Sequence, residues 1–573
     1  MMNQAEIKRK LPPHLRQFVA DQNYSARYTA KDHAVWRFVM SQLVRQLEHS
    51  AHPVYFEGLK RTGIALDSIP SIDDMNACLS KLGWQAIVVD GFIPPQAFME
   101  LQSRRILAIA LDMRSIQHIE YTPAPDIIHE AAGHAPIIAD VEYSDYLQRF
   151  GEVGMKAIYN QYDLDLYEAV RHLSIVKESN HSTQEEIAEA EQNLDNLVSH
   201  PGQPSELALL TRLHWWTVEY GLVGDTHNYA LFGAGLLSSL SESLVCMDDK
   251  KVKKLPLTVD AIKTPYDITS LQPQLFVTKS CRHLTQILNE YATTMCYQTG
   301  GAHSLEVAID AGVVTTCKLS SGITVSGKFS GLLKNAIDEV IYINTQGPSQ
   351  LAFEGVELDS QGTKFHPEGF GSPVGRLCNL MKPLEEASEY ELQEMNIVRG
   401  EHTELDFLSG IIVSGELQSI YKVKGLVVLM SFANCTVQGP EGEVLFDPSW
   451  GTYDMVVGDS VASVFAGSAD PSKFDVYPSA SPGSTQSRAE DPEELELFSK
   501  IQELRQEKRN PDQVAMQVLE SYPDNWLLLS ELLSLLPKGS KTFQTIIRRL
   551  REIKEHDVEA ASMVGKVLAT YKN

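Results

Sequence analysis

The pattern of apolar residues changes near residue 300, and this change limits the folds open to the chain more than any other feature. Before it, stretches such as 34–49 (AVWRFVMSQLVRQLEH) and 208–222 (ALLTRLHWWTVEYGL) repeat apolar residues at the spacing of amphipathic helices. After it, β-branched runs such as 312–319 (GVVTTCKL) and 340–344 (VIYIN) are interrupted by glycine, as strands are. The sequence therefore predicts a multidomain α+β chain in which a mainly helical domain precedes a β-rich one.

A chain of 573 residues is too long for one ordinary hydrophobic core, which supports a division into domains. The segment 478–494 (PSASPGSTQSRAEDPEE) has the composition of a flexible linker, and the stretches 494–506 and 540–556 beyond it have helical patterns. Packing or oligomerisation is the role expected of this helical tail. The predicted divisions are a helical domain at 1–297, a β-rich domain at 303–477, a linker at 478–492 and a helical C-terminal module at 493–573.

The β-rich domain contains an internal repeat. SGITVSG at 321–327 recurs as SGIIVSG at 409–415, and QGP at 346–348 recurs at 438–440, so the offsets are 88 and 92 residues. We interpret this as a duplicated β unit that folds as two small barrels or as one pseudo-symmetric sandwich. The alternative is chance similarity among glycine-rich strands.

Charge and hydropathy exclude two classes of partner. The chain has 49 Lys plus Arg against 75 Asp plus Glu, a formal charge of −26, whereas nucleic-acid binding needs a basic surface. The most apolar late stretch, 526–537 (WLLLSELLSLLP), is too short for a membrane span and carries Ser and Glu, so it is expected to be a core helix. We therefore expect neither a nucleic-acid nor a membrane partner.

The seven cysteines favour a reducing compartment. Their number is odd and they form no C-x-x-C pair, so buried free thiols are the simplest expectation. The N-terminal stretch has positive charge without an apolar core behind it, which disfavours a secretory signal. A cytoplasmic location is predicted.

The segment 125–136 (PDIIHEAAGHAP) contains two histidines five positions apart, His129 and His134. The zinc-protease pattern H-E-x-x-H would put the second histidine at 133, which is Gly, so that class is excluded. Five residues turn an ideal helix by about 500°, which leaves the two side chains roughly 140° apart. Binding one metal would therefore need a distorted turn, with which Gly133 and Pro136 are consistent. The alternative is a pair of ordinary helix-end histidines.

A carboxylate in an apolar setting favours the metal interpretation. Glu219 is the only acid in HWWTVEYGL (214–222), and a buried carboxylate is costly without a cation or hydrogen-bond partners. Two histidines and one carboxylate make the facial ligand set of non-haem Fe(II) oxygenases, which leaves three positions for O2, water or a co-substrate.

Three segments carry a family resemblance. YTPAPDIIHEAAGHAP (121–136), WWTVEYGL (215–222) and FGAGLLSSLSE (232–242) resemble, in order, the signatures of the pterin-dependent aromatic amino acid hydroxylases, which act on phenylalanine, tyrosine or tryptophan. The resemblance covers roughly residues 20–297 and favours a bacterial phenylalanine 4-monooxygenase-like form. It implies a mainly helical catalytic domain that uses Fe(II), tetrahydrobiopterin or a related reduced pterin, and O2. The β-rich part and the tail show no comparable resemblance.

The resemblance also implies roles for single residues. His129, His134 and Glu219 would hold the iron. Arg114 would pair with the substrate carboxylate, which its planar fork matches at two points. The other substrate-binding residues would be Thr122, Pro123, Asp126, Trp215, Gly235 and Ser238, and the pterin-binding residues Gly91, Ile93, Phe98 and Glu130. Taken singly, each of these is more often an ordinary core or surface residue.

The sequence departs from the animal enzymes of the family. Ala124 stands where Glu is common there, and His214 and Trp216 replace the usual Tyr and Phe. His214 could therefore touch the pterin pocket. No regulatory domain precedes the catalytic part, so control by an N-terminal module is not expected.

The function implied is that of a monooxygenase that hydroxylates an aromatic amino acid, with phenylalanine converted to tyrosine as the first choice and tryptophan or tyrosine as alternative substrates. Its partners would be the amino acid, O2 and the reduced pterin, with a homo-oligomer formed through the C-terminal regions. The rival hypothesis is a degenerate oxygenase that acts as a regulatory or binding protein.

Overall fold

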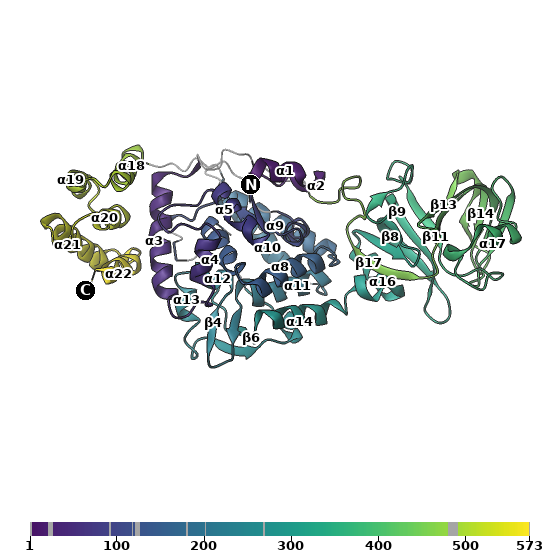
Figure 1. The fold of residues 1–573 in the computed structure, drawn as a ribbon, viewed down its shortest axis with the longest axis horizontal. Helices are drawn as coiled ribbons and strands as arrows, with labels where there is room; N and C mark the ends of the chain where they lie inside the picture. The colour runs from purple at the N-terminus through teal and green to yellow at the C-terminus, as the bar shows by residue number, and fades with distance from the viewer. Residues whose placement is uncertain are drawn as a thin grey trace.

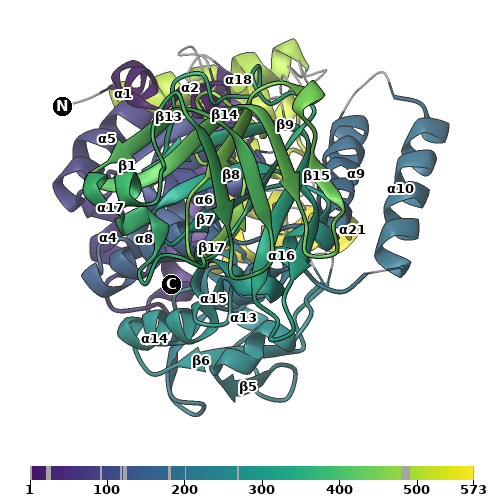
Figure 2. The same cartoon turned by 90° about the vertical axis from the view of Figure 1, so that its right-hand side faces the viewer.

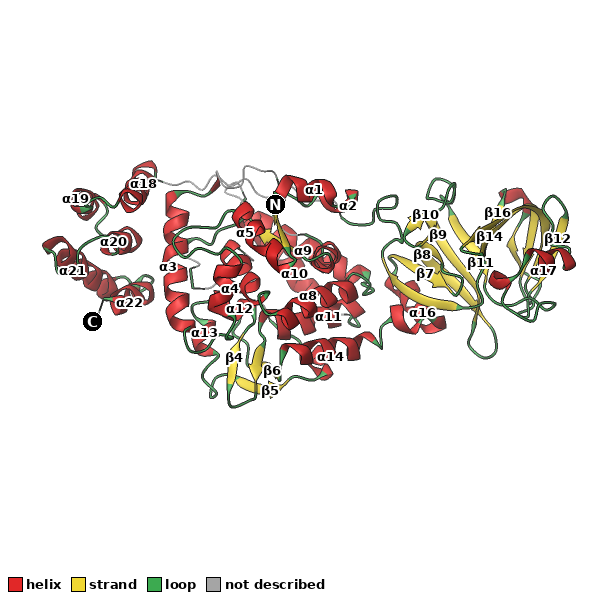
Figure 3. Ribbon diagram, in the orientation of Figure 1, coloured by secondary structure: helices red, strands yellow, loops and turns green. Residues whose placement is uncertain are grey.

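The computed structural model describes residues 3–20, 27–90, 93–116, 119–120, 126–178, 182–200, 202–267, 270–478 and 491–571. A mixed central body of helices and short strands lies between a β-rich region and a helical C-terminal region, as Figures 1 and 3 show. The α+β organisation of the chain therefore follows the change of pattern seen in the sequence. Most of the predicted linker, 479–490, lies outside the described residues.

The central body is mainly helical. A representative helix is α3 (Ala30–Leu47), in which the Thr29 side chain and Asp32 form a capping box and Trp36 and Met40 are fully buried. The other α-helices are α1 (Gln4–Lys10), α2 (Pro13–Arg16), α4 (Tyr55–Arg61), α5 (Ile72–Leu79), α6 (Pro95–Ser103), α7 (Ala135–Ile137), α8 (Val141–Gly154), α9 (Gln161–Glu178), α10 (Gln184–Ser199), α11 (Glu206–His214), α12 (Ala234–Ser238), α13 (Glu242–Val245), α14 (Cys281–Ala292), α15 (Cys296–Thr299) and α16 (Gly301–Ala311).

Two small sheets and several tighter or wider turns complete this body. β1 (Gln85–Val89) pairs in parallel with β2 (Ile106–Ala110). The second sheet has the order β4-β3-β6-β5, formed by Tyr229–Leu231, Leu222–Gly224, Gln274–Thr278 and Lys253–Pro256. The 3-10 turns are η2 (Ser80–Leu82) and η6 (Val259–Lys263), and the π-helical turns are η4 (His129–His134) and η5 (Trp215–Glu219).

Helix α10 is polar and lies at the surface of the central body. The helices α9 and α10 pack side by side at one edge of the molecule in Figure 2. Only Ala190 of α10 is buried, so this helix contributes little to the core.

The β-rich region begins later than the sequence pattern suggested. Helix α16 occupies Gly301–Ala311, and Gly312 ends it in the left-handed conformation (φ 67°). The first strand therefore starts at Val314. One sheet has the order β10-β9-β8-β7-β17 with β11 on β9, and the other has the order β12-β13-β14-β15 with β16 on β14. The strands are β7 (Val314–Leu319), β8 (Ile323–Lys334), β9 (Val340–Phe353), β10 (Val356–Glu357), β11 (Gly369–Pro373), β12 (His402–Asp406), β13 (Ile412–Val423), β14 (Leu426–Gln438), β15 (Val444–Phe446), β16 (Tyr453–Val456) and β17 (Val461–Ala466). Short helices lie between them at η7 (Leu384–Glu386), α17 (Glu389–Glu394) and η8 (Pro448–Trp450).

The strand pairings repeat along with the sequence. The series β7-β8-β9-β11 and the series β12-β13-β14-β16 have the same antiparallel neighbours. Cys317 pairs with Val325 in the first series, and the residues 88 positions later, Leu405 and Val413, pair in the second. The register shift between Ser326 and Lys328 likewise recurs between Ser414 and Glu416. This agreement of pairing and register supports the predicted duplication.

The C-terminal region is a small helical unit on α3. Its helices are α18 (Pro492–Glu507), α19 (Asp512–Ser521), α20 (Trp526–Leu533), α21 (Lys541–His556) and α22 (Ala561–Thr570). Trp526 of α20 meets the Phe38 ring of α3 edge to face, with centroids 4.9 Å apart. Residues 526–533 of the apolar stretch at 526–537 thus form a packed helix, and no helix among the described residues is long and apolar enough to cross a membrane.

Candidate metal centre

Three side chains converge between the two π-helical turns. His129 and His134 come from η4, and Glu219 is the last residue of η5. The Nε2 atoms of the two histidines are 3.1 Å apart, and each lies 3.2 Å from a different carboxylate oxygen of Glu219. Two imidazole nitrogens and two carboxylate oxygens therefore surround one point.

The π-helical turn explains how two histidines five positions apart can meet. Its hydrogen bonds join residues i and i+5, so the turn is wider than that of an α-helix and residues five apart come closer to one face. Gly133 has a packing role within this turn, because a Cβ there would lie only 2.7 Å from the carbonyl oxygen of Ala234. The distorted turn that the spacing required is present, and Gly133 lets α12 approach it.

The hydrogen bonds of His129 set the tautomer that a metal ligand needs. The Ser238 hydroxyl donates to the carbonyl oxygen of Ala234 at 2.7 Å and lies 3.1 Å from Nδ1 of His129. Because the hydroxyl proton is used, Nδ1–H donates to Ser238 and the lone pair of His129 stays on Nε2. That nitrogen is the one that faces His134 and Glu219.

Electrostatics favour a charged Glu219. Burial by itself raises the pKa of Glu219, but His134 and His129, when protonated, outweigh it through their charges and hydrogen bonds and hold the pKa well below its usual value. A cation bound between the histidines would act in the same direction. Glu130 also lies within 4.8 Å of both histidines, but burial raises its pKa to about 7. Glu219 is therefore the stronger anionic ligand. Imidazole and carboxylate donors fit a divalent iron, so the residues present suit that metal.

Arg114 and Asp126 form a buried pair beside the histidines. Nε and Nη2 of Arg114 donate to the two oxygens of Asp126 at 2.7 and 2.9 Å, and Nη1 donates to the Ser238 carbonyl at 3.1 Å. Burial raises the pKa of Asp126, but Arg114 more than compensates and the net shift is downward. Asp126 also accepts a bond from the backbone N–H of His129, so this carboxylate links the arginine to the metal centre. Within the described residues, three of the five N–H groups of Arg114 are engaged.

The aromatic wall contains Trp215. Its ring stacks on Tyr220 at 4.7 Å and on Tyr266 at 4.3 Å between centroids, and its buried indole Nε1 has no hydrogen-bond partner among the residues that the structure describes. Gly235 allows the Tyr220 ring to pack against α12, since a Cβ at that position would lie 3.0 Å from the ring. Trp215 is thus held by an aromatic stack next to Glu219.

The residues expected on the pterin side lie on and before α6. Phe98 and Ile93 are half-buried, and the Phe98 ring meets the His214 ring edge to face at 6.1 Å. Nδ1 of His214 is 3.8 Å from Glu219, while its buried Nε2 has no hydrogen-bond partner within the described part of the chain. Burial lowers the pKa of His214 to about 4, so this imidazole is neutral at pH 7. His214, which replaces the Tyr of the animal enzymes, therefore lies next to the metal centre.

Some predicted positions cannot be placed. Gly91, Thr122, Pro123 and Ala124 lie outside the described residues. Trp216, the other departure, is fully buried and donates to the carbonyl oxygen of Thr264 at 2.9 Å, which makes it part of the core.

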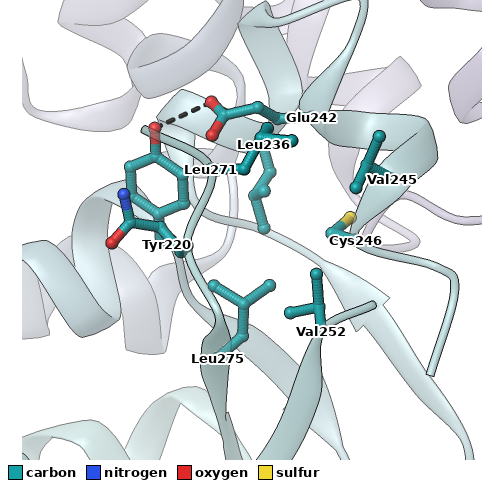
Figure 4. A pocket seen from close by; sticks show the side chains of 9 residues that line it. Tyr220, Leu236, Glu242, Val245, Cys246, Val252, Leu271 and Leu275 are labelled. Carbon is teal, nitrogen blue, oxygen red and sulfur yellow. Dashed lines mark hydrogen bonds between the residues drawn. The ribbon is translucent and has the colours of Figure 1, made fainter. Parts of the chain in front are cut away.

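A second buried carboxylate near the centre was missed by the sequence analysis. Glu242 accepts a hydrogen bond from the Tyr220 hydroxyl at 2.8 Å beside a small pocket that Leu236, Val245 and Leu275 help to line, as Figure 4 shows. Burial raises the pKa of Glu242. The signal for it was present, because Glu242 is the only acid of the segment 232–242.

Another group with metal-ligand chemistry lies away from this centre. His52, Asp140 and Cys281 have ligand atoms within 4.8 Å of one another. However, Nδ1 of His52 accepts a bond from the backbone N–H of Val54 at 3.2 Å, so Nε2 carries the proton. This tautomer opposes metal binding through Nε2, unlike that of His129.

Comparison with known proteins places the central body in a family. The family model described as biopterin-dependent aromatic amino acid hydroxylase matches residues 17–163 and 169–301. Phenylalanine-4-hydroxylase of Pseudomonas aeruginosa is 27% identical over 278 residues, which span 48% of this chain and 89% of the relative. Phenylalanine-4-hydroxylase of Chromobacterium violaceum is 28% identical over 260 residues, 45% of this chain and 73% of the relative.

A crystal structure of the Chromobacterium violaceum phenylalanine hydroxylase, with bound iron(III) and 7,8-dihydrobiopterin, superposes with a TM-score of 0.39 at 26% identity, covering 48% of this chain and 85% of that one. The family match ends at residue 301, close to the limit expected from the signatures.

Proposed function

Because residues 17–301 of this chain belong to the biopterin-dependent aromatic amino acid hydroxylase family, we propose that they form an Fe(II) monooxygenase that uses a tetrahydropterin and O2 to hydroxylate phenylalanine to tyrosine. The observation that carries this proposal is the convergence of His129, His134 and Glu219 at 3.1 to 3.2 Å beside the buried Arg114–Asp126 pair. A degenerate oxygenase would have no reason to keep both parts.

In this proposal His129, His134 and Glu219 would hold the iron. When bound, the iron and the reduced pterin would supply the activation of O2, and the residues of the chain would supply binding and orientation. The Ser238 hydroxyl fixes the tautomer of His129, and Asp126 fixes both the start of η4 and the arginine. A rigid centre of this kind holds the reacting groups at fixed distances and orientations.

The amino acid would bind with its carboxylate on Arg114 and its ring toward the wall that contains Trp215. A planar guanidinium already held by Asp126 loses little freedom when a second carboxylate arrives. The pterin would stack on Phe98, with Glu130 and the unpartnered Nε2 of His214 as polar neighbours. Tyrosine and tryptophan are the alternative substrates.

The test is turnover of the purified, iron-loaded full chain with tetrahydrobiopterin and each of the three amino acids, with products separated by chromatography. We expect tyrosine from phenylalanine as the main product. Product from tryptophan or tyrosine alone would change the substrate assignment, and iron binding without any product would favour the rival hypothesis of a regulatory or binding protein.

The role of Arg114 gives a quantitative prediction. Arg114→Lys keeps the charge but loses the two-point fork, so KM for phenylalanine should rise about ten- to a hundredfold while iron content stays the same. Arg104→Lys is the matched control, because Arg104 also holds a buried carboxylate, Glu100, through Nε and Nη2 but lies outside the pocket. Unchanged amino-acid affinity in Arg114→Lys would assign carboxylate binding to another residue.

A further inference from the structure

The helical tail contacts the central body through ion pairs at two separate places. Along α3, Lys31 pairs with Glu494 at 2.9 Å and Arg37 pairs with Glu531 at 2.6 Å. Figure 1 shows the tail helices lying beside α3. The second place is Glu120, far from Lys31 in the sequence, which is reached from the last helix of the tail.

At Glu120 two side chains of α22 bind one carboxylate oxygen. Lys566 Nζ lies 2.9 Å and the Ser562 hydroxyl 2.6 Å from Oε1 of Glu120. Partial burial raises the pKa of Glu120, but the bonds from Ser562 and Lys566 outweigh it and the net shift is downward. The carboxylate is therefore charged and held from the tail side.

The backbone carbonyl of Glu120 contacts residues of the central body that lie next to the proposed substrate site. The hydroxyls of Ser239 and Ser241 each lie 3.4 Å from the Glu120 carbonyl oxygen. Ser239 follows Ser238, whose carbonyl accepts Nη1 of Arg114. A continuous series of contacts thus runs from α22 through Glu120 to the arginine.

The energy of the Lys566–Glu120 pair is too small for a main role in stability. The Glu120 side chain is 41% exposed, and ion pairs with an exposed partner contribute about 1 kcal/mol or less, equivalent to about fivefold in an equilibrium constant. Small displacements near a reacting pair, however, have large effects on binding and rate. The position of this pair therefore matters more than its strength.

We propose that α22 is a positioning element for the amino-acid end of the active site, in which Lys566 and Ser562 hold Glu120 and thereby the Ser238–Ser241 segment that supports Arg114. This inference rests on the proposed function, because it concerns the same pocket. It gives the tail, which lies beyond the family match at 301, a part in substrate binding.

The test compares two lysine variants of the full chain. Lys566→Met keeps the aliphatic stem and removes the charge at Glu120, so KM for phenylalanine should rise about two- to fivefold, with iron content and KM for the pterin unchanged. Lys31→Met removes a lysine of similar burial from a tail ion pair away from the pocket, so KM should stay the same. The charge-reversed pair Glu120→Lys with Lys566→Glu should restore most of the loss.

Hydrogen–deuterium exchange gives a readout that does not need turnover. Peptides that cover 238–245 should exchange faster in Lys566→Met than in the wild type and not in Lys31→Met. An unchanged KM and unchanged exchange in Lys566→Met would overturn the inference, and so would equal effects in both variants. Wild-type protein without turnover would instead contradict the proposed function, while the exchange comparison would still decide the role of α22.

Discussion

Replacing Glu219 by Gln is expected to remove bound iron and abolish hydroxylation while the chain stays folded. The change keeps the size of the side chain, but the amide has no negative charge and only one acceptor oxygen, whereas both histidines now face a carboxylate oxygen at 3.2 Å. Losing a ligand should weaken iron binding by more than the roughly 10- to 100-fold seen when outer partners of ligands are removed. Metal analysis after dialysis and pterin-dependent product formation measure the two effects.

Glu242→Gln is the matched control for this prediction. Glu242 is also a buried carboxylate near the centre, but its carboxylate accepts a bond from the Tyr220 hydroxyl and its backbone N–H donates to the Ser239 hydroxyl, so neither contact involves the histidines. Burial raises the pKa of Glu242. The isosteric amide should therefore leave iron content unchanged. Full iron occupancy and normal turnover in Glu219→Gln would refute the assignment of the three ligands.

The sequence predicted the residues of the metal centre but not the backbone conformation that brings them together. Two histidines and an acid surrounded by apolar residues are unusual enough to stand out, because burying a carboxylate without a partner is costly. The spacing of five, by contrast, argued against a shared metal on an ideal helix. The π-helical turn η4 that resolves this conflict packs against α12, and the local signs of a distorted turn were Gly133 and Pro136.

For the β-rich region, the sequence predicted the internal repeat better than it predicted where the strands begin and end. The recurring SGIxVSG segments lie in β8 and β13, which hold equivalent places in their sheets. The apolar run 455–465 contains no single strand: it divides between β16 and β17, which belong to different sheets. A glycine, Gly458, separates them at a point where a Cβ would lie 2.5 Å from the Leu319 side chain.

The position of the tail had no signal in the sequence. Arg37 and Glu531 form a pair in which both side chains are nearly buried, yet 494 positions separate them. The same holds for Glu100, whose buried carboxylate accepts bonds from His14 and from the Tyr477 hydroxyl at 2.8 and 2.9 Å. Patterns within a helix show that a face is apolar, but they do not show which distant residues cover it. The expected role in oligomerisation thus stays a prediction, while the structure shows packing of the tail on α3.

Shortening the chain should lower stability strongly while leaving the metal centre in place. A fragment that ends at residue 301 keeps every proposed ligand, so we expect it to bind iron and hydroxylate phenylalanine. The fragment lacks Trp526, so the Phe38 ring that Trp526 covers becomes exposed. Exposing a buried Phe costs about 1.5–3 kcal/mol. The fragment also loses the Tyr477 bond to Glu100 and the contact in which Ser463 donates to the Tyr297 carbonyl at 2.8 Å.

The measurement compares the full chain, a chain that ends at 478 and the fragment that ends at 301, by thermal unfolding, iron content and KM for phenylalanine. Removing the tail at 478 should cost about 1.5–3 kcal/mol, which corresponds to a fall in Tm of roughly 3–12 °C for a body of this size. The fragment that ends at 301 should have a lower Tm still. The chain that ends at 478 should show the same rise in KM as Lys566→Met, because both lack the contact at Glu120. A folded, iron-loaded 301 fragment without activity would contradict the division, since the second half would then have to complete the active site.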